Sequence, residues 1–155
     1  MNIVENKQLF IEQATALVYR EENLVTNLSN LSALYKEYLP NTNWVGFYLL
    51  DEKNNNLVLG PFQGKVACTR IPFNKGVCGY CYTTRETIYV EDVHKFPGHI
   101  ACDSATNSEL VVPIIQNDKV VALLDIDSIE FDRFTKEEVE SFTEVTKKVF
   151  EKIKF

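Results

Sequence analysis

The sequence predicts an α+β fold in which helices pack against an antiparallel sheet. Three observations lead to this prediction. Two stretches with apolar residues three and four positions apart precede the strand patterns, several strand patterns are joined by short turns, and one more amphipathic stretch follows them. Helices grouped around hairpin-linked strands, rather than alternating with them, are typical of an α+β domain with an antiparallel sheet.

The first two elements are predicted helices. Residues 6–19 place Phe10, Ala14 and Leu17 on one side. A second helix begins after Asn23, whose side chain suits an N-cap, and ends before Pro40, because the residue before a proline avoids the helical conformation. Its apolar stripe predicts either a core face or a dimer face. The stripe contains Leu24, Leu28, Leu31, Tyr35 and Tyr38.

Residues 43–50 predict the first strand, because they are rich in aromatic and β-branched side chains between turn residues. Side chains alternate along a strand, so Trp44, Gly46 and Tyr48 share one face. This face combines two large aromatics that have polar tips with a glycine that leaves room, which suits a pocket wall as well as a packed core. The opposite face is predicted core and contains Val45, Phe47 and Leu49.

The remaining elements follow in order. They are a return strand at 57–59, a strand at 67–71, the start of a helix within 76–84, a strand at 88–91, a loop at 94–107, and a hairpin with strands at 109–115 and 119–127. The loop is roughly 14 residues long, and loops of that length in compact domains are usually functional. Thr135 and Glu138 form a capping box that begins a last helix.

Composition limits the classes of function. The length of 155 residues fits one domain spanning the chain. A net charge of −6, with no run of basic residues, argues against nucleic acid and anionic membranes as partners. The start, MNIVENKQLF, lacks the pattern of a signal peptide, and no stretch approaches the roughly 20 apolar residues of a membrane span. We therefore expect a cytoplasmic protein, in which cysteines are more often free, metal-bound or redox-active than structural.

The reactive side chains gather between Gly60 and Asp127, which contain every cysteine and both histidines. Cys78 and Cys81 form a C-x-x-C motif, and later His and Cys residues could complete a zinc site. A single C-x-x-C at a predicted helix start argues against zinc. It also lacks the βαβ context of thioredoxin-like redox chemistry. A third alternative is that some of these cysteines are small buried hydrophobic residues.

Asp125 and Asp127 lie two positions apart on a strand, so their carboxylates point to the same face. Glu109, on the partner strand, can join them. Buried carboxylates need compensation by a metal, a cationic ligand, hydrogen bonds or a raised pKa. The alternative is that this strand end reaches solvent and the carboxylates are hydrated.

Three runs resemble the free methionine-(R)-sulfoxide reductases, a GAF-domain family. They are GPFQGKVACTRIPFNKGVCG, VEDVHKFPGHIACDSATNSELVVP and LLDIDS. Cys68, Cys78 and Cys102 stand at the spacings of the family's three cysteines, whereas Cys81 departs from the family pattern. The resemblance implies a GAF fold with a central antiparallel sheet of about five to six strands. It places the N- and C-terminal helices on one face and a ligand pocket on the other.

The resemblance also implies roles in the reduction of free L-methionine-(R)-sulfoxide. Cys102 would be the nucleophile and would become a sulfenic acid. Glu109 and Asp127 would bind and protonate the sulfoxide oxygen, which requires raised pKa values. The substrate-binding residues would be Trp44 against the S-methyl group, Tyr48 in the pocket wall and Asp125 near the ammonium group.

Cys68 would then attack Cys102, with Cys78 as an alternate resolving thiol, and a thioredoxin-type dithiol would reduce the disulfide. This implies no metal and no organic cofactor, and it leaves Cys81 as a spectator. His94 and His99 can each stabilise the Cys102 thiolate or hold the loop by hydrogen bonds, and the second role is favoured, most strongly for His94. The sequence is compatible with a homodimer and with a monomer.

The rival prediction is a non-catalytic GAF domain that binds a small molecule or senses redox state. Such a sensor usually accompanies an output domain, and a cyclic-nucleotide pocket would hardly need three cysteines and a carboxylate cluster.

Overall fold

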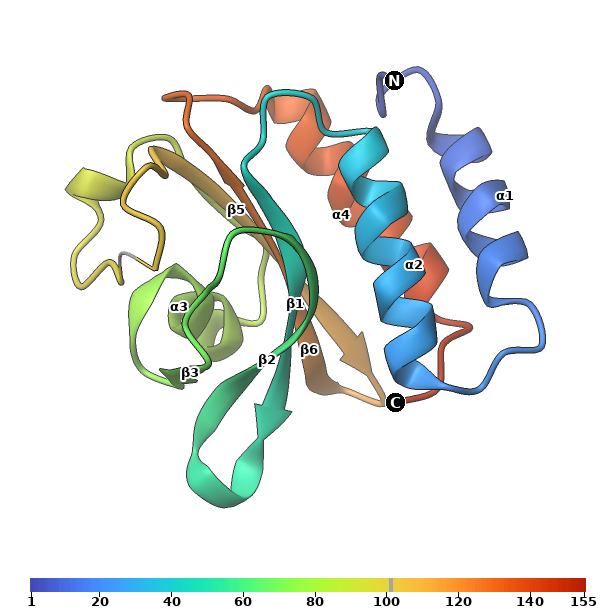
Figure 1. The fold of residues 1–155 in the computed structure, drawn as a ribbon, viewed down its shortest axis with the longest axis horizontal. Coiled ribbons are helices and arrows are strands. Elements are labelled where there is room, and N and C mark those ends of the chain that lie inside the picture. Colours follow the sequence, from blue (N-terminus) through green and yellow to red (C-terminus); the bar gives the residue numbers. More distant parts are fainter. Residues whose placement is uncertain (101) are drawn as a thin grey trace.

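The computed structural model describes residues 1–100 and 102–155, which fold into a six-stranded antiparallel sheet flanked by helices (Figure 1). This confirms the predicted α+β class and strand number. The helices are α1 (Lys7–Val18), α2 (Leu24–Glu37), α3 (Gly76–Thr84) and α4 (Lys136–Phe150), with short 3₁₀ turns at Glu52–Asn54 and Val93–Lys95. The strands are β1 (Trp44–Asp51), β2 (Asn56–Gly64), β3 (Arg70–Pro72), β4 (Ile88–Val90), β5 (Ser108–Gln116) and β6 (Lys119–Ser128).

The sheet has the strand order β3-β2-β1-β6-β5-β4, and each neighbouring pair is antiparallel. The centre therefore joins β1 and β6, which are far apart in the sequence. Their register places Trp44 opposite Asp127, and the β5–β6 register places Glu109 opposite the same Asp127. Because opposed residues point to the same face, these three side chains form a row across the sheet.

Helices α2 and α4 cover one face of the sheet and α1 packs against them from outside, so the N- and C-terminal helices lie on one side as expected (Figure 1). The apolar stripe of α2 lies in the core against β1 and β2, so the core interpretation is correct. Tyr35 lies at its centre and shares a hydrogen bond of 2.7 Å with Thr146. The prediction for Leu17 was wrong, since Leu17 is 42% exposed and Val18 is buried instead.

The opposite face of the sheet is covered by α3 and by the segment that follows β4 (Figure 1). Here two strand predictions differ from the structure. Strand β2 continues to Gly64 because it stays paired with β1 as far as Trp44, and β3 is only three residues long. Cys68, predicted on a strand, therefore lies in the connection between β2 and β3.

Local signals explain most of the element ends. Asn23 accepts a hydrogen bond from the Thr26 amide, and Thr135 begins α4 with the predicted capping box. Asn117 and Asp118 turn the β5–β6 hairpin with φ of 51° and 62°, which Asn and Asp tolerate better than most residues. No helix in residues 1–100 and 102–155 combines the length and the apolar character that crossing a membrane requires.

Candidate active site

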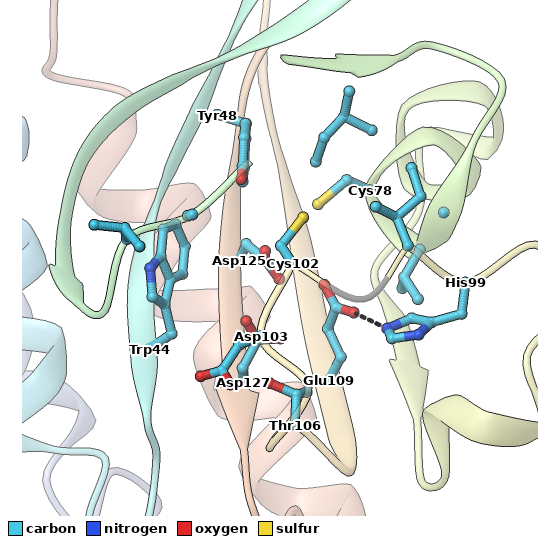
Figure 2. Close-up of a pocket in the computed structure, with 16 residues that line it drawn as sticks. Trp44, Tyr48, Cys78, His99, Cys102, Asp103, Thr106, Glu109, Asp125 and Asp127 are labelled. Carbon is cyan, nitrogen blue, oxygen red and sulfur yellow. Dashed lines mark ion pairs between the residues drawn. The ribbon is translucent and has the colours of Figure 1, made fainter. Parts of the chain in front are cut away.

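A cavity of about 30 Å³ lies between the sheet and the elements that cover its second face (Figure 2). Every site residue predicted from the sequence except Cys68 lines it directly, and Cys68 is bonded to Cys102, which does. The lining residues come from β1, β3, β5, β6, α3 and two connecting segments. They include Trp44, Tyr48, Cys78, His99, Cys102, Asp103, Thr106, Glu109, Asp125 and Asp127.

Three carboxyl groups meet on one side of this cavity. Glu109 and Asp125 are only 7% and 5% exposed, and the Oδ1 atoms of Asp125 and Asp127 are buried without a hydrogen-bond partner among the described residues. The alternative of hydrated carboxylates is therefore wrong. Burial raises the pKa of Glu109 and of Asp127 well above the ordinary carboxyl values, and the charge of Asp125 raises both further.

Burial also raises the pKa of Asp125, but no neighbouring charge among the described residues raises it further. The protons on the nearby Glu109 and Cys78 side chains counteract the effect of burial on this pKa. Adjacent carboxyl groups in a buried space cannot all be ionised, because their negative charges repel one another. Such groups share protons and titrate as a set. Within this cluster the environment therefore favours protons on Glu109 and Asp127 and negative charge on Asp125.

The two histidines have different surroundings. His99 places Nε2 at 3.8 Å from Oε1 of Glu109, and burial, followed by the charge of His94, lowers its pKa (Figure 2). His99 is thus held mainly neutral beside a carboxyl that favours its protonated form. His94 instead contacts Asn107 through Nε2 at 2.8 Å, and its amide donates to Asp92. The structure supports the loop-holding role expected for His94.

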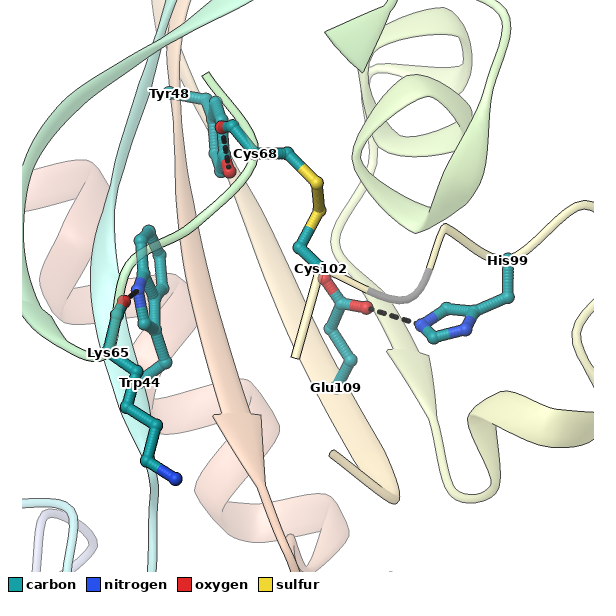
Figure 3. The surroundings of a disulfide bond; sticks show 7 residues. All are labelled: Trp44, Tyr48, Lys65, Cys68, His99, Cys102 and Glu109. Atoms are coloured by element: carbon teal, nitrogen blue, oxygen red, sulfur yellow. Dashed lines mark hydrogen bonds and ion pairs between the residues drawn. A yellow bond between two sulfur atoms is a disulfide. The ribbon is translucent and has the colours of Figure 1, made fainter. Parts of the chain in front are cut away.

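A disulfide joins Cys68 to Cys102 (Figure 3). Their Cα atoms are 5.4 Å apart, although 34 residues separate them in the sequence. This is the pair that the resemblance implies. The bond connects the β2–β3 segment to the long loop after β4. Its Cys102 end lies beside Glu109 in the cavity lining (Figure 3).

Two pocket aromatics hold the segment that carries Cys68. The Trp44 indole donates from Nε1 to the Lys65 carbonyl at 3.1 Å, and the Tyr48 hydroxyl donates to the Cys68 carbonyl at 2.9 Å (Figure 3). The Trp44 and Tyr48 rings are stacked, with centroids 5.9 Å apart. Their polar tips therefore fix the position of Cys68, while their rings face the cavity.

The space beside Gly46 favours one of the two alternatives that the sequence left open, a packed core. A Cβ atom there would overlap the Cβ of Phe62 and lie 2.8 Å from Cη2 of Trp44. Phe62 stacks on the Trp44 indole with centroids 5.1 Å apart. The missing side chain at Gly46 therefore makes room for aromatic packing that orients Trp44, and not for a ligand.

The C-x-x-C motif lies on α3 with its two thiols in different surroundings. Cys78 lines the cavity, and burial, followed by the charges of Asp125 and Glu109, raises its pKa. The Cys81 thiol instead donates to the Glu86 carbonyl at 3.2 Å and is fully buried outside the cavity lining. Among the described residues, the Cys and His side chains weighed as zinc ligands are not brought together.

Sequence patterns missed the residues that anchor the loop after Cys102. Asn43, immediately before β1, donates from Nδ2 to Asp103 Oδ2 at 2.9 Å and to Thr106 Oγ1 at 3.1 Å. Asp103 also accepts from the Ala105 amide at 2.9 Å. Asp103 could have been proposed as an anchor from the sequence, because it directly follows the candidate nucleophile Cys102. Nothing local marked Asn43, because its partners are about 60 residues away.

Comparison with known proteins agrees with this geometry. The GAF domain model matches residues 31–149. Free methionine-R-sulfoxide reductase from Escherichia coli is 50% identical over 79% of this chain and 73% of its own length, and its namesake from Saccharomyces cerevisiae is 49% identical over 83% and 77%. The crystal structure of free methionine-R-sulfoxide reductase from Neisseria meningitidis, in complex with its substrate, has a TM-score of 0.90, with 38% identity over 97% of this chain and 90% of that one. This chain therefore belongs to the free methionine-R-sulfoxide reductases, a family built on the GAF domain.

Proposed function

We propose that the protein reduces free L-methionine-(R)-sulfoxide to methionine, and that residues 1–155 form a single catalytic domain. One observation supports this most directly. The Cys68–Cys102 disulfide lies across a small cavity walled by three carboxyl groups, of which Glu109 and Asp125 belong to buried residues. The cavity therefore combines a two-electron thiol donor with groups that favour bound protons, which are the two requirements of sulfoxide reduction.

The first half of the cycle transfers oxygen to sulfur on the protein. The Cys102 thiolate attacks the sulfoxide sulfur while an acid protonates the departing oxygen. The sulfur–oxygen bond of the substrate breaks, and the oxygen leaves with Cys102 as a sulfenic acid. Methionine sulfur gains two electrons, Cys102 loses them, and no metal or organic cofactor takes part.

Glu109 and Asp127 act as the proton donors. Their raised pKa values keep protons available to the sulfoxide oxygen. Asp125, which favours its charged form within the cluster, binds the substrate ammonium group. The Trp44 ring packs against the S-methyl group and Tyr48 lines the same wall.

The second half of the cycle restores the thiols. Cys68 attacks Cys102 and releases the oxygen as water, which leaves the disulfide. A thioredoxin-type dithiol, of the kind that the cytoplasm supplies, reduces the disulfide in two exchange steps. Cys78 is the alternate resolving thiol, since it lines the same cavity. Cys81 takes no part, and a homodimer is compatible with this cycle but is not required by it.

Single-turnover methionine release tests the assignment of the cysteines. Cys68→Ser, reduced and freed of reductant, should release about one equivalent of methionine, because attack by Cys102 precedes resolution. Its turnover with thioredoxin should fall sharply, and further in Cys68→Ser/Cys78→Ser. Cys102→Ser should release none. Cys81→Ser is the matched control and should behave as the parent does. Retention of the single-turnover yield by Cys102→Ser would refute the proposal.

A further inference from the structure

The inner wall of the cavity contains a cluster that the proposed reaction uses only in part. Cys78 from α3, Glu109 from β5 and Asp125 from β6 bring one sulfur and two carboxylate oxygens within 4.8 Å of one another (Figure 2). All three residues are more than nine-tenths buried, at 3%, 7% and 5% exposure. Rigid helix and strand elements supply them, so the arrangement does not depend on a loop.

The cluster is short of positive charge. None of the described residues that line the cavity is a lysine or an arginine, and the pKa of its one histidine, His99, is lowered. Asp125 Oδ1 is buried and has no hydrogen-bond partner among the described residues. A buried, unpartnered carboxylate oxygen beside a second carboxyl and a thiol is the arrangement that a bound cation would satisfy.

We propose that Cys78, Glu109 and Asp125 form a binding site for a thiophilic divalent cation of the Zn²⁺ class. Binding releases the protons of Cys78 and Glu109, and the resulting thiolate and two carboxylates are ligands that zinc accepts, with a fourth position left for water. Tetrahedral zinc holds such ligand atoms about 3.5 Å apart. The three atoms lie within 4.8 Å of one another, so small shifts of these side chains complete the site. Magnesium and calcium, which prefer oxygen ligands alone, fit this set poorly.

The cation is an inhibitor and not a cofactor, and this step rests on the proposed function. Two of its three ligands, Glu109 and Asp125, are the groups that bind the sulfoxide oxygen and the ammonium group. The cation and the substrate therefore exclude each other. Zinc binding would inhibit the reductase without a bond between the zinc and Cys102.

Cobalt absorption tests the site without any measurement of activity. In the protein with the Cys68–Cys102 disulfide intact, Cys78 and Cys81 are the remaining thiols. Added Co²⁺ should give a thiolate-to-metal absorption band that saturates at about one ion per chain and is lost when Zn²⁺ is added. Cys81→Ser should keep the band and Cys78→Ser should lose it. Asp125→Asn should keep the fold but bind Co²⁺ at least about tenfold more weakly.

The result separates this proposal from the proposed function. A parent protein with no band, or a Cys78→Ser variant with the parent's band, would overturn the cation site. The inhibitory role is tested with protein reduced by a phosphine, since dithiols bind zinc. Zn²⁺ added before substrate should suppress single-turnover methionine release, and a chelator should restore it in the parent and in Cys81→Ser. Full release at saturating Zn²⁺ would refute inhibition. Absence of release without metal would instead refute the reductase assignment and leave the cobalt result standing.

Discussion

At the scale of single residues, the carboxyl cluster determines what the cavity can do. Glu109 and Asp127 are pushed toward their protonated forms by burial and by the charge of Asp125. A carboxylic acid is a proton donor near neutral pH only in such an environment. The same burial that makes these residues useful for chemistry makes their ionised forms costly for folding.

Glu109→Gln and Asp127→Asn separate these two effects. Each amide keeps the shape of the side chain but cannot donate a proton to a leaving oxygen. General acid assistance contributes about 10² to 10⁴-fold, so we expect each variant to lose at least about tenfold in kcat. Single-turnover methionine release at pH 7 measures this loss. Unchanged rates in both variants would remove the acids from the mechanism.

The same variants should gain stability, and the gain should depend on pH. Because the folded-state pKa of each acid is raised, the folded protein binds more protons than the unfolded chain once pH exceeds the ordinary values of 4.5 for Glu109 and 3.8 for Asp127. Stability therefore falls as pH rises from those values toward the raised pKa. Amides do not titrate, so the advantage of each variant in melting temperature should be smallest near pH 4 and should grow toward pH 8.

Residue patterns predicted much of this cluster, for a physical reason. Alternation along a strand has a period of two, so Asp125 and Asp127 had to share a face, and Glu109 on the antiparallel partner could join them. The register that places Glu109 opposite Asp127 came from the structure. The burial of that face was not predictable, because it depends on α3 and the long loop covering the sheet. The choice between pocket wall and packed core at Gly46 was open for the same reason, since Phe62 reaches it from another strand.

At the scale of elements, two connections deliver the cysteines to the sheet. Trp44 and Tyr48 hold the β2–β3 connection that carries Cys68, and Asn43 holds the loop that carries Cys102 through Asp103 and Thr106. Both sets of anchors are in or next to β1. The central strand therefore sets the positions of both sulfur atoms.

Asn43→Ala should misplace the Cys102 loop without removing any reacting group. Loss of its two side-chain hydrogen bonds should slow Cys68–Cys102 disulfide formation after substrate addition by at least about tenfold, because small displacements strongly reduce reaction rates. The thiol content after rapid mixing measures this step. Asn54→Ala, which removes an exposed hydrogen bond to Asp51, is the matched control and should form the disulfide at the parent's rate. Equal rates in Asn43→Ala and the parent would show that the loop is fixed by other contacts.

Element ends were predicted best where the signal is local. Asn23, Thr135 and Asn117 each mark an end through their own hydrogen bonds or dihedral preference. The β2–β3 region was predicted poorly because pairing with β1, the preceding strand of the same hairpin, decides where β2 ends. Tertiary contact overrode strand propensity there.

At the scale of the whole molecule, the Cys68–Cys102 disulfide is also a cross-link that closes a long loop. A cross-link between residues 34 apart restricts the unfolded chain, and by chain entropy alone stabilises the fold by about 3 to 4 kcal/mol. The oxidised protein should therefore unfold at a higher temperature than the reduced protein at the same pH. Thermal unfolding with and without a phosphine measures the difference. Cys68→Ser should abolish it and Cys81→Ser should preserve it.

The small volume of the cavity in the disulfide-bonded form sets the sequence of events. The walls of the cavity close around a space of about 30 Å³ when the disulfide is formed, which leaves little room between them. We therefore expect the oxidised protein to admit methionine sulfoxide poorly until a reductant has opened the disulfide. On this expectation the sulfoxide and the reductant bind in turn, and an excess of sulfoxide does not compete with reduction of the disulfide.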